Sequence, residues 1–305
     1  MVDAIAHFIT FADGSRDIKD SGARIVEQVL KSNLFKSATC YDAAFLKAKP
    51  IEGKNLIDEN LKGFGFWIWK PLLIQYILGN VIEDHEVLVY CDAGSEVVNN
   101  FFSKRNFFQL ISHLEKQDVI AFDTTVLEYQ YTKKVCLELL KLRDNQNTNQ
   151  VAATTIVLRN TAVSRNFVDY WVAFATQNNG LYINDSLGLE LEEFKEHRYD
   201  QSIFSVLYKN ENMKSFDLIC PRYELSEPRV KFIEKVLHNN LFFWQIRNRT
   251  GTSSVSWWQS STAIAFLLLP VTLSRPVFRV IDRTARQGFS WFLHSYKRSK
   301  PGIHR

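Results

Sequence analysis

The sequence predicts an α/β fold with a mostly parallel central sheet, for three reasons. Residues 7–11 and 38–41 have strand-like patterns, and residues 21–30 between them place their apolar side chains on one helical face. This strand–helix–strand order is that of a βαβ unit, which joins parallel strands. Residues 86–91 (EVLVYC) form a nearly continuous apolar run, which is typical of a strand buried on both faces of a sheet.

The other elements follow from the same periodicities in chain order. Pro71 favours the start of a helix, because a proline in the first turn loses no hydrogen bond. Ser164 is a suitable N-cap for another. The expected elements are helices at 71–78, 101–117, 128–142, 164–176 and 203–208, and strands at 118–122 and 150–160.

The composition is that of a globular protein. The chain has 305 residues, of which 46% are hydrophobic and 23% are charged, so a disordered chain is not expected. The four cysteines are widely spaced and form no CxxC pair, which indicates neither a zinc site nor a disulfide framework. The first residues contain no basic segment followed by a cleavage site. We therefore expect a cytoplasmic protein.

Charge divides the chain near residue 240. Residues 241–305 carry ten Lys or Arg and one acidic residue, a net charge of +9. Because the whole chain is +4, residues 1–240 carry −5. We therefore expect one domain over 1–240 and a basic, Trp-rich helical extension over 241–305 that meets an anionic partner.

Part of this extension, residues 255–273, holds an apolar core of about a dozen residues, which is too short and has flanks too polar to predict a membrane span. The tryptophans and arginines around it fit an element that lies on an anionic surface, such as the inner face of a membrane. A helix pair packed on the main domain is the alternative. Nucleic acid is not an expected partner, because residues 1–240 are acidic and carry no recognised binding motif.

A carboxylate ends the buried strand. Asp92, Ala93 and Gly94 follow the run 86–91, and open α/β sheets bind ligands outside the carboxyl ends of their strands. Just upstream, residues 63–71 (GFGFWIWKP) combine glycines and aromatic residues with a single lysine. The pattern favours a ligand site. A simple turn that requires Asp and Gly is the alternative.

A second polar cluster, residues 196–204 (EHRYDQSIF), begins an apolar helix. Asp200 is well suited to the N-terminus of a helix, which is one interpretation. The other is a functional site that contains Asp200 and Gln201. The sequence has no Walker loop, Rossmann glycine fingerprint or nucleophile elbow, so kinase, dehydrogenase and α/β-hydrolase functions are not expected.

The motifs WIWKP (67–71), VLVYCDAG (87–94) and HRYDQSIF (197–204) together resemble those of small bacterial glycosyltransferases of the GT-A fold that build surface polysaccharides. More distantly, they are similar to galactosyl- and mannosyltransferases. The resemblance implies a single GT-A-like, Rossmann-like domain that moves a sugar from a nucleotide-sugar donor to a glycan or lipid-linked acceptor. A catalytically inactive protein that binds a nucleotide sugar or a glycan at the membrane is the alternative.

The resemblance also implies roles for individual residues. Asp92 would hold a divalent metal, Mn²⁺ or Mg²⁺, that bridges the donor diphosphate. His197 would be a second ligand, since imidazole suits such an ion. Tyr90 stands where many of these enzymes carry a first aspartate, which leaves metal dependence open. Asp200 and Gln201 would be catalytic, with Asp200 facing the sugar.

Donor binding is expected from several segments. Lys70 would neutralise phosphate or orient the sugar, and small side chains in strand 150–160 would let the sugar approach the backbone. Trp67 and Trp69 would stack on a sugar or pack in the core. Arg159 is a further donor candidate, and Asp185 is a candidate on the acceptor side. The expected donor-binding residues are Thr10, Ala12, Trp69, Lys70, Asp92, Ala93, Gly94, Ala152, Ala153 and Thr154.

Overall fold

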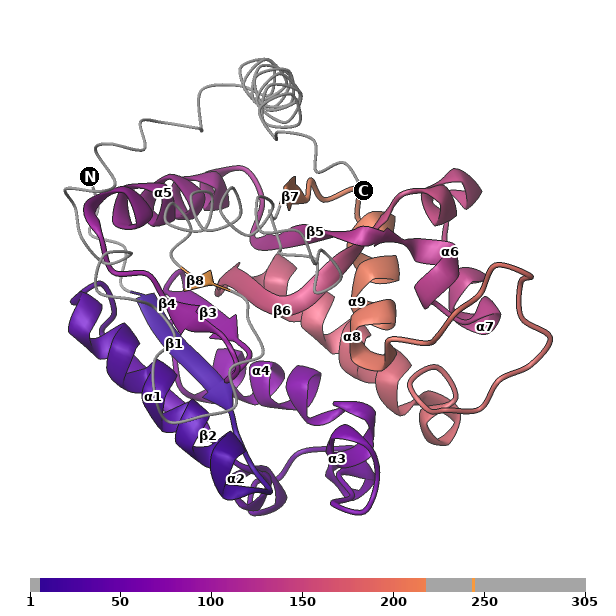
Figure 1. Ribbon diagram of the computed structural model, residues 1–305, viewed down its shortest axis with the longest axis horizontal. Coiled ribbons are helices and arrows are strands. Elements are labelled where there is room, and N and C mark those ends of the chain that lie inside the picture. Colours follow the sequence, from indigo (N-terminus) through magenta and orange to yellow (C-terminus); the bar gives the residue numbers. More distant parts are fainter. Residues whose placement is uncertain (1–5, 218–242, 245–305) are drawn as a thin grey trace, which may run out of the picture.

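The computed structural model describes residues 6–217 and 243–244 (Figure 1). Helices and strands alternate through most of this part of the chain. The strands are β1 (Ala6–Phe11), β2 (Ser37–Tyr41), β3 (Val87–Cys91), β4 (Glu96–Val97), β5 (Val119–Leu127), β6 (Asn149–Arg159), β7 (Phe216–Asp217) and β8 (Phe243–Trp244). The helices are α1 (Arg16–Ser32), α2 (Ala43–Lys47), α3 (Gly63–Phe66), α4 (Trp69–Asn80), α5 (Phe101–Ser112), α6 (Glu128–Tyr131), α7 (Lys134–Leu137), α8 (Ala162–Gly180) and α9 (Tyr199–Asn210). Short 3₁₀ turns occur at Lys54–Leu56, His113–Glu115 and Arg143–Asn147.

Six of these strands form a mixed sheet in the order β2-β1-β3-β6-β5-β7. Strand β1 is parallel to both β2 and β3, and β5 is parallel to β7. Strand β6 is antiparallel to both of its neighbours, β3 and β5. The expected mostly parallel sheet is therefore corrected to a mixed one. Burial on both faces makes a strand apolar, but it does not set the strand's direction, so the sequence pattern did not reveal the reversal of β6.

The strand order places a topological switch point at the carboxyl ends of β1 and β3. The chain leaves β1 for β2 on one side and later returns to β3 on the other side. Ligands of open α/β sheets bind at such a switch point. Phe11 ends β1 and Cys91 ends β3, so Ala12 and Asp92 directly follow the two strands that border this switch point.

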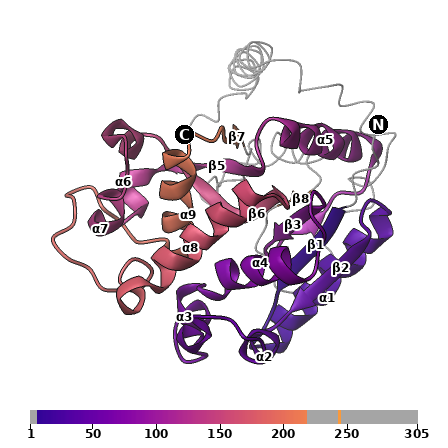
Figure 2. The same cartoon turned by 180° about the vertical axis from the view of Figure 1, so that it is seen from behind.

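The core lies on both faces of the sheet. Along β3, Leu88 and Tyr90 face the cluster formed with α4, α8 and α9, while Val87, Val89 and Cys91 face the cluster formed with α1 and α5. Helices α4 and α8 pack against one another on the first face (Figures 1 and 2). The continuous apolar run is explained because both sets of side chains are buried.

Two of the expected helices differ in detail. The segment 128–142 forms α6 and α7 instead of one helix, because Thr132 and Lys133 between them are extended. Both side chains are buried in polar contacts with other parts of the molecule. Helix α8 is capped by Thr161, and Ser164 lies three residues later as its reciprocal partner in a capping box. Ser164 is therefore not the N-cap.

The C-terminal extension contributes one short strand to the described structure. Its described residues, Phe243–Trp244, form strand β8, which pairs antiparallel with β4 just after Asp92. This piece is extended and not helical. The remaining residues of 241–305, with the membrane contact expected of them, lie outside the described residues. Within 6–217 and 243–244, no helix combines the length and apolarity needed to cross a membrane.

Candidate functional site

Lys70 joins three distant parts of the chain in a buried ionic cluster. Its side chain is 4% exposed, and its Nζ lies 2.9 Å from Asp200 Oδ2 and 3.3 Å from Asp92 Oδ1. The same nitrogen donates a hydrogen bond of 3.1 Å to the carbonyl oxygen of Ala153. An ammonium group has three protons, and three oxygens surround this one. We call Lys70, Asp92, Ala153 and Asp200 the lysine cluster.

Each member of the lysine cluster comes from a different element. Lys70 is the second residue of α4, Asp92 follows β3, Ala153 lies in β6, and Asp200 is the second residue of α9. The antiparallel pairing of Cys91 with Thr155 brings β6 to the end of β3. The three sequence motifs thus meet at one point, which is at the carboxyl end of β3.

The segment labelled α3 is a left-handed turn that leads into α4. Residues 63–67 all have positive φ angles, between 57° and 90°, and Phe64, Phe66 and Trp67 among them are not glycine. Left-handed backbone costs a non-glycine residue roughly 1–2 kcal/mol, so surrounding contacts must hold this turn. At Gly65 a Cβ would lie 2.2 Å from the carbonyl oxygen of Leu56, so only glycine fits there.

Trp69 packs the start of α4 against the sheet. Its ring stacks on Phe11 at the end of β1, with centroids 3.8 Å apart and planes at 14°. Its Nε1 donates to the carbonyl oxygen of Gly63, and the residue is 5% exposed. Trp69 therefore packs in the core, which corrects its expected contact with the donor. Trp67 and Phe66 instead pack against Tyr199.

The protonation states of the lysine cluster follow from burial and charge. Burial alone would lower the pKa of Lys70, but Asp200 and Asp92 hold it above its ordinary value. Burial raises the pKa of Asp200 to about 6, against the opposing effect of Lys70. Burial, with the charge of Asp92, raises the pKa of Tyr90 well above its ordinary value. The neutral Tyr90 hydroxyl donates to Asp92 Oδ1 at 2.5 Å.

Asp92 is the accessible carboxylate of the cluster. Its side chain is 39% exposed, whereas that of Asp200 is 6% exposed. The loop after Asp92 is held by α1: Arg24 Nη2 donates to the carbonyl oxygens of Ala93 and Ser95, at 3.2 and 3.1 Å. Asp92 therefore presents a carboxylate oxygen from a well-supported loop, and Asp200 lies behind it.

His197, one of the two expected metal ligands, has both ring nitrogens in contact with the backbone. His197 is buried; its Nδ1 accepts from the backbone N–H of Lys133, and its Nε2 lies 2.9 Å from the carbonyl oxygen of Tyr182. Burial lowers the pKa of His197 to about 3, so the ring is neutral. Both nitrogens serve backbone groups, which corrects its assignment as a ligand. The described ranges contain no group of three or more His, Cys, Asp or Glu placed to hold a metal.

Gln201 is held by the protein at both ends of its amide. Its Oε1 accepts from the backbone N–H of Ala153 at 3.3 Å, and its Nε2 donates to Gln150 Oε1 at 2.6 Å. Gln150 Nε2 in turn contacts Ser202 and the side chain of the fully buried Glu128. Sequence reasoning missed this network, although a glutamine and a glutamate beside apolar strand segments were available as a signal.

The other expected donor residues divide by accessibility. Gly94 and Thr154 are partly exposed. Thr10 is fully buried, and its Oγ1 has no hydrogen-bond partner within the described chain. Arg159 pairs with Val87 at the opposite end of β3 from Asp92, because β6 runs antiparallel, and it binds Asp118 there. Arg159 is thus removed from the site. The expected donor residues that are buried are Thr10, Ala12, Trp69, Lys70, Ala93, Ala152 and Ala153.

A polar and aromatic group lies next to the lysine cluster in sequence. Lys62 Nζ donates to the Tyr199 hydroxyl at 2.8 Å, and Asp185 interacts with the same hydroxyl. Tyr199 directly precedes Asp200 and has a positive φ of 49°. The sequence singled out Asp185 but not Lys62 or Tyr199, although Tyr199 lies inside the HRYDQSIF motif.

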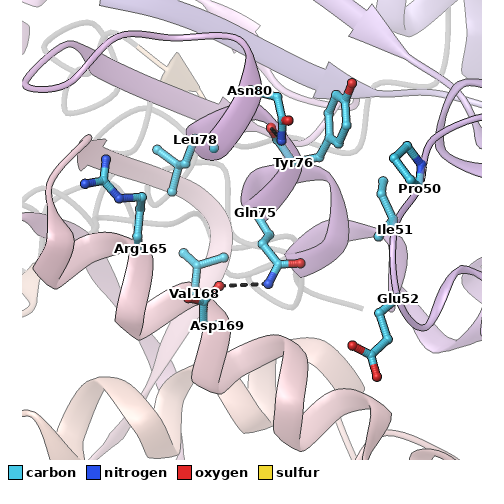
Figure 3. Close-up of a pocket in the computed structure, with 11 residues that line it drawn as sticks. Pro50, Ile51, Glu52, Gln75, Tyr76, Leu78, Asn80, Arg165, Val168 and Asp169 are labelled. Carbon is cyan, nitrogen blue, oxygen red and sulfur yellow. Dashed lines mark hydrogen bonds between the residues drawn. The ribbon is translucent and has the colours of Figure 1, made fainter.

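A separate pocket lies between α4 and α8 (Figure 3). Gln75 Nε2 donates to Asp169 Oδ1 at 2.7 Å across it. Its lining includes Pro50, Tyr76 and Arg165, and no member of the lysine cluster. The pocket is therefore distinct from the lysine cluster at the carboxyl end of β3.

No family model and no curated protein matches the chain. Several solved structures align with the chain at low sequence identity and with TM-scores below 0.5. Apo mouse xyloside xylosyltransferase 1 aligns with a TM-score of 0.43 and 9% identity, over 80% of this chain and 96% of that chain. Galactosyltransferase LgtC, solved with donor and acceptor sugar analogues, aligns with a TM-score of 0.41 and 12% identity, over 86% and 94%. The 4-diphosphocytidyl-2C-methyl-D-erythritol synthase of Anaerococcus prevotii aligns with a TM-score of 0.36 and 11% identity, over 77% and 99%. Such distant likenesses assign no role to any residue of this chain.

Proposed function

We propose that the protein is a glycosyltransferase that moves a sugar from a nucleotide-sugar donor to a glycan or lipid-linked acceptor in the synthesis of cell-surface polysaccharide. One observation carries the proposal: the Lys70 ammonium group lies within 3.3 Å of carboxylate oxygens of both Asp92 and Asp200. These three residues come from the three motifs that resemble glycosyltransferases. They meet beside the switch point of the sheet, where such folds bind ligands.

The donor sugar lies against Asp92 in this proposal. The Asp92 carboxylate is accessible, and its Oδ1 is fixed by Tyr90 and Lys70. A carboxylate accepts hydrogen bonds from sugar hydroxyls, and the partly exposed Gly94 and Thr154 border the same strand ends. Asp92 is therefore the candidate catalytic group. Lys70 and Asp200 are positioning residues, since they reach a ligand only through Asp92.

The acceptor enters beside Tyr199. Aromatic rings and charged groups together suit a carbohydrate, because ring faces pack on sugar carbons while polar groups bind hydroxyls. Lys62, which is exposed, is a cation on this side and donates to the Tyr199 hydroxyl. Asp185, which is exposed, completes this group.

A second candidate function is a catalytically inactive protein that binds a nucleotide sugar or a glycan. Tyr90 favours it, because this neutral side chain stands where glycosyltransferases of the type resembled carry a carboxylate. Turnover separates the two functions, since both predict binding.

Thermal stabilisation by a panel of nucleotide sugars tests the proposal. We expect one UDP- or GDP-sugar to raise the melting temperature of the wild-type chain, and the rise to be lost in Asp92→Asn. Asp169→Asn, in the pocket between α4 and α8, is the matched control and should retain the rise. A flat panel on folded protein would contradict both candidate functions.

A further inference from the structure

We propose that Lys70 is the site's own cation: its ammonium group joins the two carboxylates in place of a divalent metal, so that the site works without one. The part of this proposal that concerns the donor rests on the proposed glycosyltransferase function. The part that concerns metal binding rests on geometry alone.

Three oxygens surround the Lys70 ammonium group, two from carboxylates in ion pairs and one from a hydrogen-bonded carbonyl. Lys70 Nζ lies 2.9, 3.1 and 3.3 Å from oxygens of Asp200, Ala153 and Asp92. Carboxylate and carbonyl oxygens are also the ligands that hard divalent cations take, at 2.0–2.6 Å. These three oxygens are thus of the kind that binds a metal, and the Lys70 ammonium group occupies the point where they converge.

A metal cannot share the position of the Lys70 ammonium group. The lysine is 4% exposed and comes from the fixed start of α4, so it does not swing away to solvent. A divalent ion between the same carboxylates would face a like charge within a few ångströms, in an interior where charges interact more strongly than in water. The second carboxylate oxygen of Asp92 could supply only one metal ligand, and His197 has no free ring nitrogen to supply another.

Tyr90 is part of the same arrangement. Its hydroxyl takes Asp92 Oδ1 as acceptor, and its ring lies 5.2 Å from Lys70 Nζ. A carboxylate at this position would place a third negative charge beside Asp92 and Asp200, with one ammonium to balance three. The neutral tyrosine supports Asp92 without this charge. The presence of Tyr90 and the buried lysine are therefore two parts of one arrangement.

Direct Mn²⁺ binding, followed by electron paramagnetic resonance on the full-length chain, tests the geometric part. We expect wild type to bind Mn²⁺ no more tightly than Asp92→Asn. In Lys70→Met, which frees the three oxygens, we expect Mn²⁺ to bind at least tenfold more tightly than in wild type. Lys70→Met/Asp200→Asn should lose this gain.

Wild-type Mn²⁺ binding that Asp92→Asn weakens tenfold would overturn the proposal, and this comparison remains decisive if the Lys70 variants do not fold. For the donor part, the nucleotide sugar that stabilises the chain should bind with the same Kd, within twofold, in EDTA and in Mn²⁺. A tenfold loss in EDTA would overturn it. If no nucleotide sugar binds, the proposed function fails, while the Mn²⁺ comparison still decides whether Lys70 replaces a metal.

Discussion

Lys70 and Asp200 form a buried ion pair across the core, with Nζ 2.9 Å from Oδ2. Each is the second residue of its helix, α4 and α9 respectively. The pair therefore fixes the two helix starts relative to one another, and Asp92 at the end of β3 is attached to the same ammonium group. Stability and the geometry of the site depend on the same contact.

Removing the lysine should destabilise the protein strongly. In Lys70→Met two carboxylates lose their cation, and breaking a buried pair costs about 3–5 kcal/mol. Urea unfolding should show a loss of this order, with a smaller loss in Lys70→Met/Asp200→Asn because one unpaired charge is removed. Lys47→Met is the control, since its pair with Glu59 is exposed and such pairs contribute about 1 kcal/mol or less. Equal losses at Lys70 and Lys47 would contradict the buried pair.

His197 should make stability fall in mild acid. Burial lowers its pKa in the folded protein from 6.5 to about 3. Between these values the unfolded chain binds the proton and the folded protein does not, so acid favours unfolding. As pH falls below 6.5, this group should remove about 1.4 kcal/mol of stability per pH unit.

His197→Gln isolates this effect. Glutamine can accept from the Lys133 N–H and donate to the Tyr182 carbonyl, as the histidine does, but it does not titrate. Unfolding free energies at pH 7, 6, 5 and 4 should fall less steeply in the variant than in wild type. Parallel curves for the two proteins would show that His197 is not buried as a neutral ring.

Gly65 should tolerate no side chain. Its φ is +90°, and a Cβ would lie 2.2 Å from the Leu56 carbonyl oxygen. Gly65→Ala should lower the free energy of unfolding by about 2 kcal/mol or more, and the melting temperature should fall with it. Gly79 in α4 faces open space, since a Cβ added there would have nothing within 4 Å, so Gly79→Ala should stabilise by roughly 0.5–1 kcal/mol. The same sign for both substitutions would argue against the left-handed turn.

Lys133 should order the loop that carries Asp185. Its buried ammonium group donates to the carbonyl oxygens of Leu181, Asn184 and Ser186 and to the Asn184 side chain. Lys133→Met should speed amide hydrogen exchange in residues 181–190 by at least tenfold. The neighbouring exposed Lys134 provides the control, Lys134→Met. Unchanged exchange in the Lys133 variant would mean that the loop is held by other contacts.

Much of the fold could be predicted from local patterns. The expected strands at 7–11, 38–41 and 150–160 correspond closely to β1, β2 and β6. The direction of β6 could not be predicted, because apolar periodicity is the same in either direction. The break between α6 and α7 was also hidden, since it depends on contacts of Thr132 and Lys133 with segments distant in sequence.

The site was predictable in its residues more than in their roles. Lys70, Asp92 and Asp200 were each singled out by motif, and the structure brings them together. Sequence gives no measure of burial, so it did not show that three oxygens surround the lysine. It also could not show that His197 binds two backbone groups, because these come from Lys133 and Tyr182.

Sugar transfer at Asp92 is measured most directly by the release of nucleotide from the nucleotide sugar that stabilises the protein. Wild-type protein in EDTA should release the nucleoside diphosphate, with the rate increased by a suitable glycan or lipid-linked acceptor. Asp92→Asn should reduce the rate at least a hundredfold, while Asp169→Asn should leave it unchanged. A donor that binds to the wild-type protein but is not turned over, with every acceptor offered, would contradict catalysis and favour the inactive binding protein.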